Sequence, residues 1–99
     1  MPKVRFVVFH SQGPNWQVGV PAFEQPGLQA HVEHYAILLK DAKLELGGPF
    51  IDEASGGMMI PEETVSEEEI RSFAAEDPAV KAGLLRFDIR RWMPALHKR

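Results

Sequence analysis

The sequence predicts a small α+β domain of the ferredoxin-like type, with its elements in the order β-α-β-β-α-β. Three observations carry this prediction. The chain opens with a strand-length run of β-branched and aromatic residues, it contains two helix-forming segments, and each of these is followed by short apolar stretches bounded by glycine and proline. In this arrangement both helices lie on one face of a four-stranded sheet.

The first strand is predicted over Val4 to Phe9. Both of its alternating sets of side chains are apolar, so we expect both of its faces to be covered. The segment from His10 to Pro26 contains Gly13-Pro14 and Pro21 among polar residues, which predicts a long loop. A loop of this length in a compact domain is usually functional or held in place by a partner.

The main helix is predicted over Leu28 to Ala42, because this segment has no glycine or proline and its apolar residues recur at intervals of three and four. At about 100° per residue, the apolar stripe centres on Leu28, Tyr35 and Leu39. His31 then lies at the edge of the buried face, and His34 points to solvent.

Two strands of a hairpin are predicted next, over Leu44 to Phe50 and over Gly56 to Pro61, joined through residues 51–55. Neither glycine pair is a phosphate-binding loop. Gly47-Gly48-Pro49 lacks the lysine and the following helix of that motif, and the other pair precedes a strand.

The second helix begins after Ser66, which forms a capping box with Glu69. Asp77-Pro78 ends this helix, one further turn follows, and Gly83 is a natural C-cap. The last strand alternates apolar Leu85, Phe87 and Ile89 with charged residues.

The composition fits one domain over residues 1–99, since 99 residues cannot build a second core. The chain has no cysteine, which excludes disulfides, a thiol nucleophile and cysteine-ligated metals, and fits a reducing, cytoplasmic location. The net charge is −3 and the basic residues near the end form a tail, so we expect no nucleic-acid partner. The apolar run at the start is too short for a signal or a membrane span.

One face of the predicted sheet has no helix to cover it. Val7, Phe9 and either Met58 or Met59 would form a contiguous apolar patch on that face. We therefore expect a homodimer packed sheet against sheet.

Histidine and carboxylate are the residues best able to carry chemistry. A half-buried imidazole such as that of His31 suits proton transfer near neutral pH, although a core-edge histidine bonded to a carbonyl fits the pattern too. His31 and His34 have the spacing of a metal-binding pair, with His10 or Glu33 as a conceivable third ligand, but no clear third ligand is visible and we expect no metal and no cofactor.

Asp77 precedes a proline, a combination typical of a helix N-cap. Because the two helices share one sheet face, its carboxylate could also orient an imidazole on the first helix. In the long loop, Asn15 and Trp16 could form a wall of a pocket or could anchor the loop on a dimer partner.

Taken in order, His31, Leu46-Gly47-Gly48-Pro49-Phe50, Gly56-Gly57-Met58-Met59-Ile60, Asp77-Pro78-Ala79-Val80 with Gly83-Leu84, and Trp92 resemble the YCII-related (YciI-like) family over nearly the whole chain. The resemblance implies the dimeric α+β barrel superfamily, whose protomers are ferredoxin-like and pair sheet to sheet. It also implies an enzyme built around a His–Asp pair, matched here by His31 and Asp77. The longer proline-rich loop of this chain departs from the family pattern.

The resulting hypothesis is a small metal-free enzyme that uses His31 and Asp77 for acid–base chemistry on a small cyclic or aromatic molecule, in an isomerisation, elimination or hydrolysis. Trp16 and Tyr35 would be walls of the pocket, shaped also by Gly48 and Pro49. The alternative is a non-catalytic domain that binds a small molecule or docks on a larger enzyme. In an enzyme, the two catalytic side chains should lie within hydrogen-bond reach and open to one cavity.

Overall fold

The computed structural model describes residues 3–52 and 55–98. The elements along the chain are β1 (Arg5–Gln12), the 3₁₀ helix η1 (Ala22–Glu24), α1 (Leu28–Lys40), β2 (Leu44–Pro49), β3 (Gly57–Pro61), α2 (Glu67–Ala75), α3 (Pro78–Lys81) and β4 (Leu85–Trp92). The four strands form one antiparallel sheet in the order β2-β3-β1-β4. The ferredoxin-like prediction is confirmed. Two residues of the predicted hairpin connection, 53–54, lie outside the described residues.

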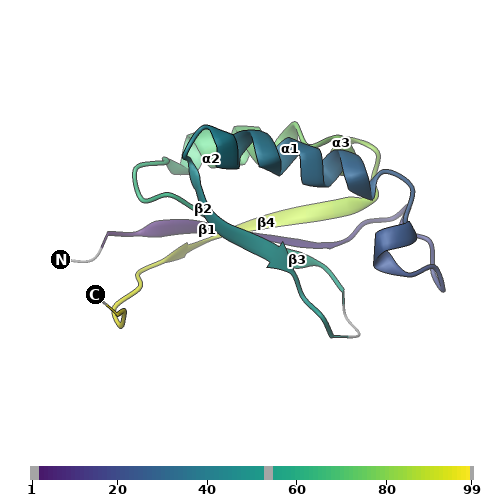
Figure 1. Ribbon diagram of the computed structural model, residues 1–99, viewed down its shortest axis with the longest axis horizontal. Helices are drawn as coiled ribbons and strands as arrows, with labels where there is room; N and C mark the ends of the chain where they lie inside the picture. Colours follow the sequence, from purple (N-terminus) through teal and green to yellow (C-terminus); the bar gives the residue numbers. More distant parts are fainter. Residues whose placement is uncertain (1–2, 53–54, 99) are drawn as a thin grey trace.

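All the α-helices lie on one side of the sheet, as Figure 1 shows. The main core lies between the two layers and is formed by Val8 and Met59 of the sheet, Val65 of the connection, and Tyr35, Leu38, Ile70 and Ala74 of the helices. Burial of this apolar surface is the main favourable contribution to folding. Within the described residues, no helix combines the length and the apolar character needed to cross a membrane.

The strand β1 is longer than predicted. Its pairing with β4 runs from Arg5 opposite Trp92 to Gln12 opposite Leu85, so His10 belongs to the strand and not to the loop. The prediction ended the strand where the apolar run ends, but main-chain pairing with a neighbouring strand continues past the last apolar residue. His10 thereby shares the helix-covered face with Val8, two residues before it.

The predicted caps are present. The hydroxyl of Ser66 accepts a hydrogen bond from the backbone N–H of Glu69 at 3.1 Å, which caps the start of α2 as predicted. The carboxylate of Glu69 pairs with Lys43 instead of completing the capping box. Gly83 ends α3 with φ +75°, and a Cβ there would lie 2.7 Å from the amide nitrogen of Asn15. A larger residue at position 83 would therefore meet both backbone strain and a steric clash.

The buried stripe of α1 differs from the prediction. Its buried residues are His31, Tyr35 and Leu38, whereas Leu39, placed by the periodicity at the centre of the stripe, is 57 % exposed. Val32 is also largely exposed. Both exposed residues line a cavity beside α1, so this apolar flank of the helix faces a pocket and not the packed core.

The loop from Gly13 to Gly27 is held in place by hydrogen bonds within the chain. The backbone of Gly13 and that of Asn15 donate to the carbonyls of Leu84 and Gly83, and the Asn15 side chain donates to Ala82 at 2.8 Å. Asn15 thus anchors the loop on the turn before β4 of its own chain.

A second anchor lies within the loop. The buried amide of Gln25 accepts from the backbone N–H of Gln17 and donates to the carbonyls of Gln17 and Val20, at 2.8–2.9 Å. Three hydrogen bonds from one buried side chain satisfy backbone groups that the irregular loop cannot pair by itself.

The other face of the sheet carries no helix among the described residues (Figure 1). Val7, Phe9, Met58 and Ile60 line a shallow apolar hollow there, bordered by Arg90, Arg91 and Trp92 of β4. The prediction that one of the two adjacent methionines would share this face with Val7 and Phe9 is met by Met58, while Met59 lies in the core.

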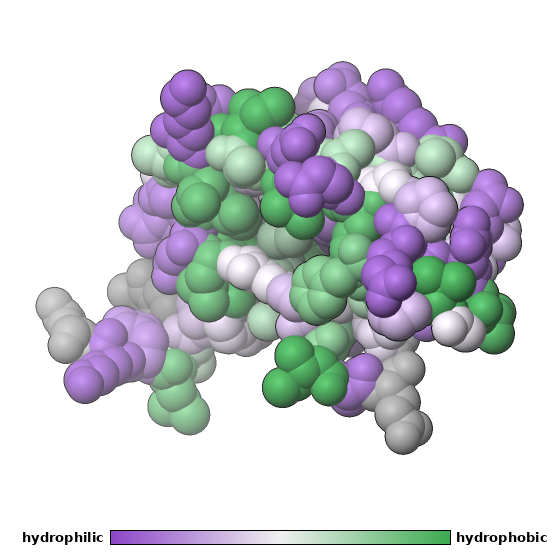
Figure 2. All heavy atoms as spheres, turned by 45° about the vertical axis from the view of Figure 1, so that its right-hand side comes forward, coloured by the Kyte–Doolittle hydropathy of each residue, from purple (hydrophilic) through white to green (hydrophobic). Residues whose placement is uncertain are grey.

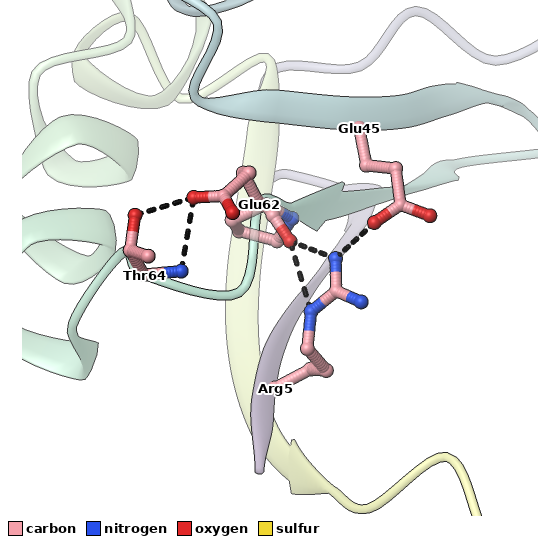
Figure 3. Close-up of polar contacts among 5 residues, drawn as sticks. Arg5, Glu45, Glu62 and Thr64 are labelled. Atoms are coloured by element: carbon pink, nitrogen blue, oxygen red, sulfur yellow. Dashed lines mark hydrogen bonds and ion pairs between the residues drawn. The ribbon is translucent and has the colours of Figure 1, made fainter. Parts of the chain in front are cut away.

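Arg5 links β1 to β2 and β3 through polar contacts of its side chain, as Figure 3 shows. It lies at the opposite end of β1 from His10. Its guanidinium donates to the carbonyl of Pro61 in β3 and forms an ion pair with Glu45 of β2 at 2.6 Å. Glu45 is half exposed, so the ion pair adds little stability, whereas the bond to the carbonyl fixes the edge of the sheet. These polar contacts are structural and do not touch the cavity.

Candidate functional site

The His31 and Asp77 side chains meet between α1 and the start of α3. Nδ1 of His31 lies 2.5 Å from Oδ2 of Asp77, and the two residues are 8 % and 0 % exposed. Since a carboxylate oxygen accepts, Nδ1 of His31 carries the proton and donates it to Asp77. Nε2 is then the nitrogen with the free lone pair.

Asp77 performs both of the roles that its sequence context suggested. Oδ1 accepts from the backbone N–H of Ala79 at 2.9 Å as the N-cap of α3, while Oδ2 holds His31. Burial disfavours the charged carboxylate, but the hydrogen bonds donated by His31 and Ala79 outweigh it, so the pKa of Asp77 lies below its ordinary value. The carboxylate stays ionised and keeps the imidazole in one tautomer.

The remaining nitrogen of His31 is available to a ligand. Within the described residues, Nε2 has no hydrogen-bond partner, and none of their buried side-chain nitrogens or oxygens lacks one. Nε2 is therefore reachable and is not sealed against a carbonyl. The interpretation of His31 as a core-edge residue satisfied by a backbone carbonyl is wrong, because its partner is a carboxylate.

His31 opens into a cavity of about 340 Å³ between α1, the Gly13–Gly27 loop and the β2-β3 hairpin. This volume lies within the usual range for small-molecule sites. The lining is mostly apolar, and no Lys, Arg, Asp or Glu is among the described residues that form it. On the face turned forward in Figure 2, hydrophobic residues gather in the middle, bordered by hydrophilic ones over the helices.

A second buried histidine shares the cavity with His31. The rings of His10 and His31 are 4.8 Å apart between centroids and nearly perpendicular. Nδ1 of His10 lies 3.1 Å from the carbonyl of Arg86, and Nε2 lies 2.8 Å from the hydroxyl of Tyr35. Burial, and then the neighbouring His31, lower the pKa of His10 to about 4, so this imidazole is neutral at physiological pH.

The residues predicted to shape the pocket all lie on this cavity. Trp16, Tyr35, Gly48 and Pro49 line it together with His31. Asp77 lies behind His31 and does not line the cavity, so the expectation that both side chains of the pair open to it is wrong for Asp77, which is fully buried as the cap of α3. Trp16 also packs against the small cluster of Ala79, Leu84 and Leu85, so the loop brings the indole to the cavity from the end of the sheet near His10. The structure brings these residues together around one cavity.

His34 is placed differently from the prediction. Its ring is stacked on Phe73 with centroids 4.0 Å apart, and its Nε2 donates to the Phe73 carbonyl at 2.7 Å. The periodicity of one helix could not show this, because α2 covers that side of α1. His34 therefore ties two helices together and does not turn toward a metal site shared with His31.

A different set of groups could approach a metal ion. His10, His31 and Asp77 each offer a ligand atom, and these atoms lie within 4.8 Å of one another. Both nitrogens of His10 and both oxygens of Asp77 already have hydrogen-bond partners. A metal would have to displace these bonds, so the arrangement suits proton transfer better than metal binding.

Sequence reasoning missed His10 and Phe23 as cavity residues. His10 continues the alternation of Phe6 and Val8, which was a usable signal once the strand was extended by two residues. Phe23 lies on η1, lines the cavity and is 80 % exposed, so it sits at the entrance. Nothing in the local pattern distinguishes it from an ordinary loop residue.

No protein-family model and no curated protein matches this chain. Among solved structures, the chain is similar to the 5-chloro-2-hydroxyhydroquinone dehydrochlorinase of Burkholderia phenoliruptrix AC1100, in complex with 2,5-dihydroxybenzoquinone. The sequence identity is 26 % and the TM-score 0.54, over 89 % of this chain and 92 % of the other. The chain thus has the protomer fold of the dimeric α+β barrel superfamily and shares it with an enzyme.

Proposed function

We propose that the protein is a small enzyme in which His31, held by Asp77, removes a proton from a hydroxylated ring compound and so drives elimination of a leaving group. The observation that carries the proposal is the buried His31–Asp77 pair, with the free Nε2 of His31 opening on an apolar cavity. We also propose that the chain is related to the YCII-related family, on the basis of His31, Gly47-Gly48-Pro49 and Asp77-Pro78.

The two residues divide the chemistry in a simple way. Nε2 of His31 accepts the proton of a ring hydroxyl, while Asp77 accepts from Nδ1 and stabilises the imidazolium that forms. The electron pair released from the O–H bond enters the ring, and the halogen-bearing carbon takes up a proton, which gives a keto tautomer. A second ring hydroxyl then loses its proton, its electron pair forms the second carbonyl, and the pair of the breaking carbon–halogen bond leaves with the halide. One proton and one halide leave the same molecule, so no external oxidant or reductant takes part.

The cavity favours an uncharged ring as the substrate. It has the size of a small-molecule site, its walls are mostly apolar, and its described lining offers no Lys or Arg to pair with a carboxylate. The structural neighbour acts on a chlorinated trihydroxybenzene, and its complex holds a dihydroxybenzoquinone. These features together support a halogenated, hydroxylated benzene as the substrate class.

Release of chloride tests this proposal. We expect the purified protein to release chloride from 5-chloro-2-hydroxyhydroquinone, measured with a chloride electrode, faster than the same solution without protein. Calorimetric binding of the ring compound without chloride release would favour the non-catalytic binding domain. Absence of both would contradict the proposal.

We further propose that two chains associate through the open sheet face. The apolar residues Val7, Phe9, Met58 and Ile60 lie together there; Val7 and Ile60 are already buried, while Phe9 and Met58 remain partly exposed and would be covered by a second sheet. Two such faces in contact would complete a core of which one chain supplies half.

The Met58→Lys variant tests this association. A lysine on the open face would bury a charge in the interface, so we expect the variant to be monomeric where the unaltered protein is dimeric, as measured by sedimentation equilibrium. Ser72→Lys, an exposed position on α2, is the matched control and should keep the dimer. A monomeric unaltered protein, or a dimeric Met58→Lys variant, would count against the proposed interface.

A further inference from the structure

Two series of hydrogen bonds between side chains end at the polar side of the cavity. In the first, His31 donates from Nδ1 to Asp77. In the second, His10 lies between the main-chain carbonyl of Arg86 and the hydroxyl of Tyr35. The rings of His31 and Tyr35 are neighbours, with centroids 5.3 Å apart, and both line the cavity.

The Arg86 carbonyl at the buried end fixes which groups donate and which accept in the second series of hydrogen bonds. A carbonyl oxygen only accepts, so Nδ1 of His10 must carry the proton that it donates to Arg86. Because the lowered pKa of His10 keeps this ring neutral, its Nε2 has a lone pair and no proton. The hydroxyl of Tyr35 must therefore donate to His10, and burial raises the pKa of Tyr35, which keeps the phenol protonated.

Nε2 of His31 and the phenol oxygen of Tyr35 consequently present only acceptors to a ligand. The one proton of the Tyr35 hydroxyl is used by His10, which leaves the lone pairs of the phenol oxygen. Nε2 of His31 also offers a lone pair, since Asp77 fixes the proton on Nδ1. A carbonyl, an ether or a quinone oxygen finds no donor on either His31 or Tyr35.

We propose that the polar end of the cavity is a two-acceptor site that selects aromatic diols, with one ring hydroxyl donating to His31 and a second donating to Tyr35. This inference rests on the proposed function and specifies its substrate. Tyr35 is then a residue that contacts the substrate, and not only an apolar wall, while His10 is a positioning residue that sets the direction of the Tyr35 hydroxyl.

The two-acceptor site also affects product release. Elimination of a proton and a halide converts a ring diol to a compound with carbonyl oxygens. Nε2 of His31 can donate to one of these oxygens only while it holds the abstracted proton. Once that proton passes to solvent, the carbonyl oxygens face two acceptors, so the product loses the hydrogen bonds that held the substrate. Binding energy thus distinguishes substrate from product.

The Tyr35→Phe variant tests the inference through ligand preference. Phenol is compared by calorimetry with the three benzenediols (catechol, resorcinol and hydroquinone), which cover the possible spacings of two hydroxyls. We expect at least one diol to bind the unaltered protein about 10-fold more tightly than phenol, the value of one good hydrogen bond. In Tyr35→Phe this preference should disappear while phenol binds within about 2-fold of its original affinity.

A His10→Leu variant separates positioning from simple structural support. Without His10, the Tyr35 hydroxyl is free to donate, so a monomethyl ether of the preferred diol should gain about 10-fold in affinity relative to the diol. A purely structural role of His10 would weaken both ligands equally. If His10→Leu does not fold, the Tyr35→Phe result alone decides.

The outcomes distinguish this inference from the proposed function. Equal affinity for phenol and all three diols in the unaltered protein, or a diol preference that survives in Tyr35→Phe, overturns the two-acceptor site and leaves His31 as a possible base. Failure of every ring compound to bind overturns the proposed function, and the inference with it.

Discussion

The Asp77→Asn variant is expected to fold and to lose at least about 100-fold in turnover. The amide oxygen can still accept from the backbone N–H of Ala79, so the cap of α3 is kept. The amide nitrogen that then faces His31 is a donor, and Nδ1 of His31 must become the acceptor. The proton moves to Nε2, which can no longer accept one from a substrate.

Circular dichroism and chloride release together check this result. The Asp77→Ser variant serves as a control for the cap, because serine is an N-cap residue that cannot reach His31 as the carboxylate does. Both variants should retain helix content and both should be inactive. A fully active Asp77→Asn protein would mean that the tautomer of His31 does not matter to the reaction.

The lowered pKa of Asp77 also links stability to pH. Its ordinary pKa is 3.8 and its value in the folded protein is lower, so the carboxylate stabilises the fold at any pH above 3.8. That contribution is lost as the pH falls below 3.8 through the folded value. The difference in melting temperature between the unaltered protein and Asp77→Asn should therefore shrink as the pH falls below 3.8.

The His31→Ala variant is expected to lose about 10²- to 10⁴-fold in turnover, the usual contribution of a general base. The removed ring leaves a space beside Asp77 that is open to the cavity, so added imidazole can enter it. We expect imidazole to restore part of the activity in proportion to its concentration.

The exposed His97 supplies the matched control, since His97→Ala removes an imidazole that does not line the cavity and should keep full activity. Thermal unfolding must show that His31→Ala is folded at the assay temperature. Full turnover in a folded His31→Ala protein would remove His31 from the reaction altogether.

The sequence alone was sufficient to predict the fold and to suggest the central pair. Element order followed from local patterns such as the Ser66 N-cap, which act within a few residues and are present in the folded protein. Asp77 and His31 are 46 residues apart, yet their contact could be suggested because the fold places both helices on one sheet face.

The features that escaped prediction depend on contacts distant in sequence. His10 was assigned to a loop because its neighbours are polar, but pairing with Phe87 holds it in β1. His34 seemed exposed because a helical wheel does not show the covering Phe73. Leu39 matched the core periodicity, yet it faces a cavity, and a pattern of apolar residues cannot tell a packed core from the wall of a pocket.

The anchored loop over the cavity has a consequence for the speed of ligand capture. Gln25 and Asn15 fix the loop through side-chain hydrogen bonds that need no ligand. A wall that is ordered in advance forfeits little conformational entropy when a ligand arrives. Association should then follow a single diffusive encounter through the entrance beside Phe23, with a rate that rises linearly with ligand concentration and shows no plateau from a slow closing step.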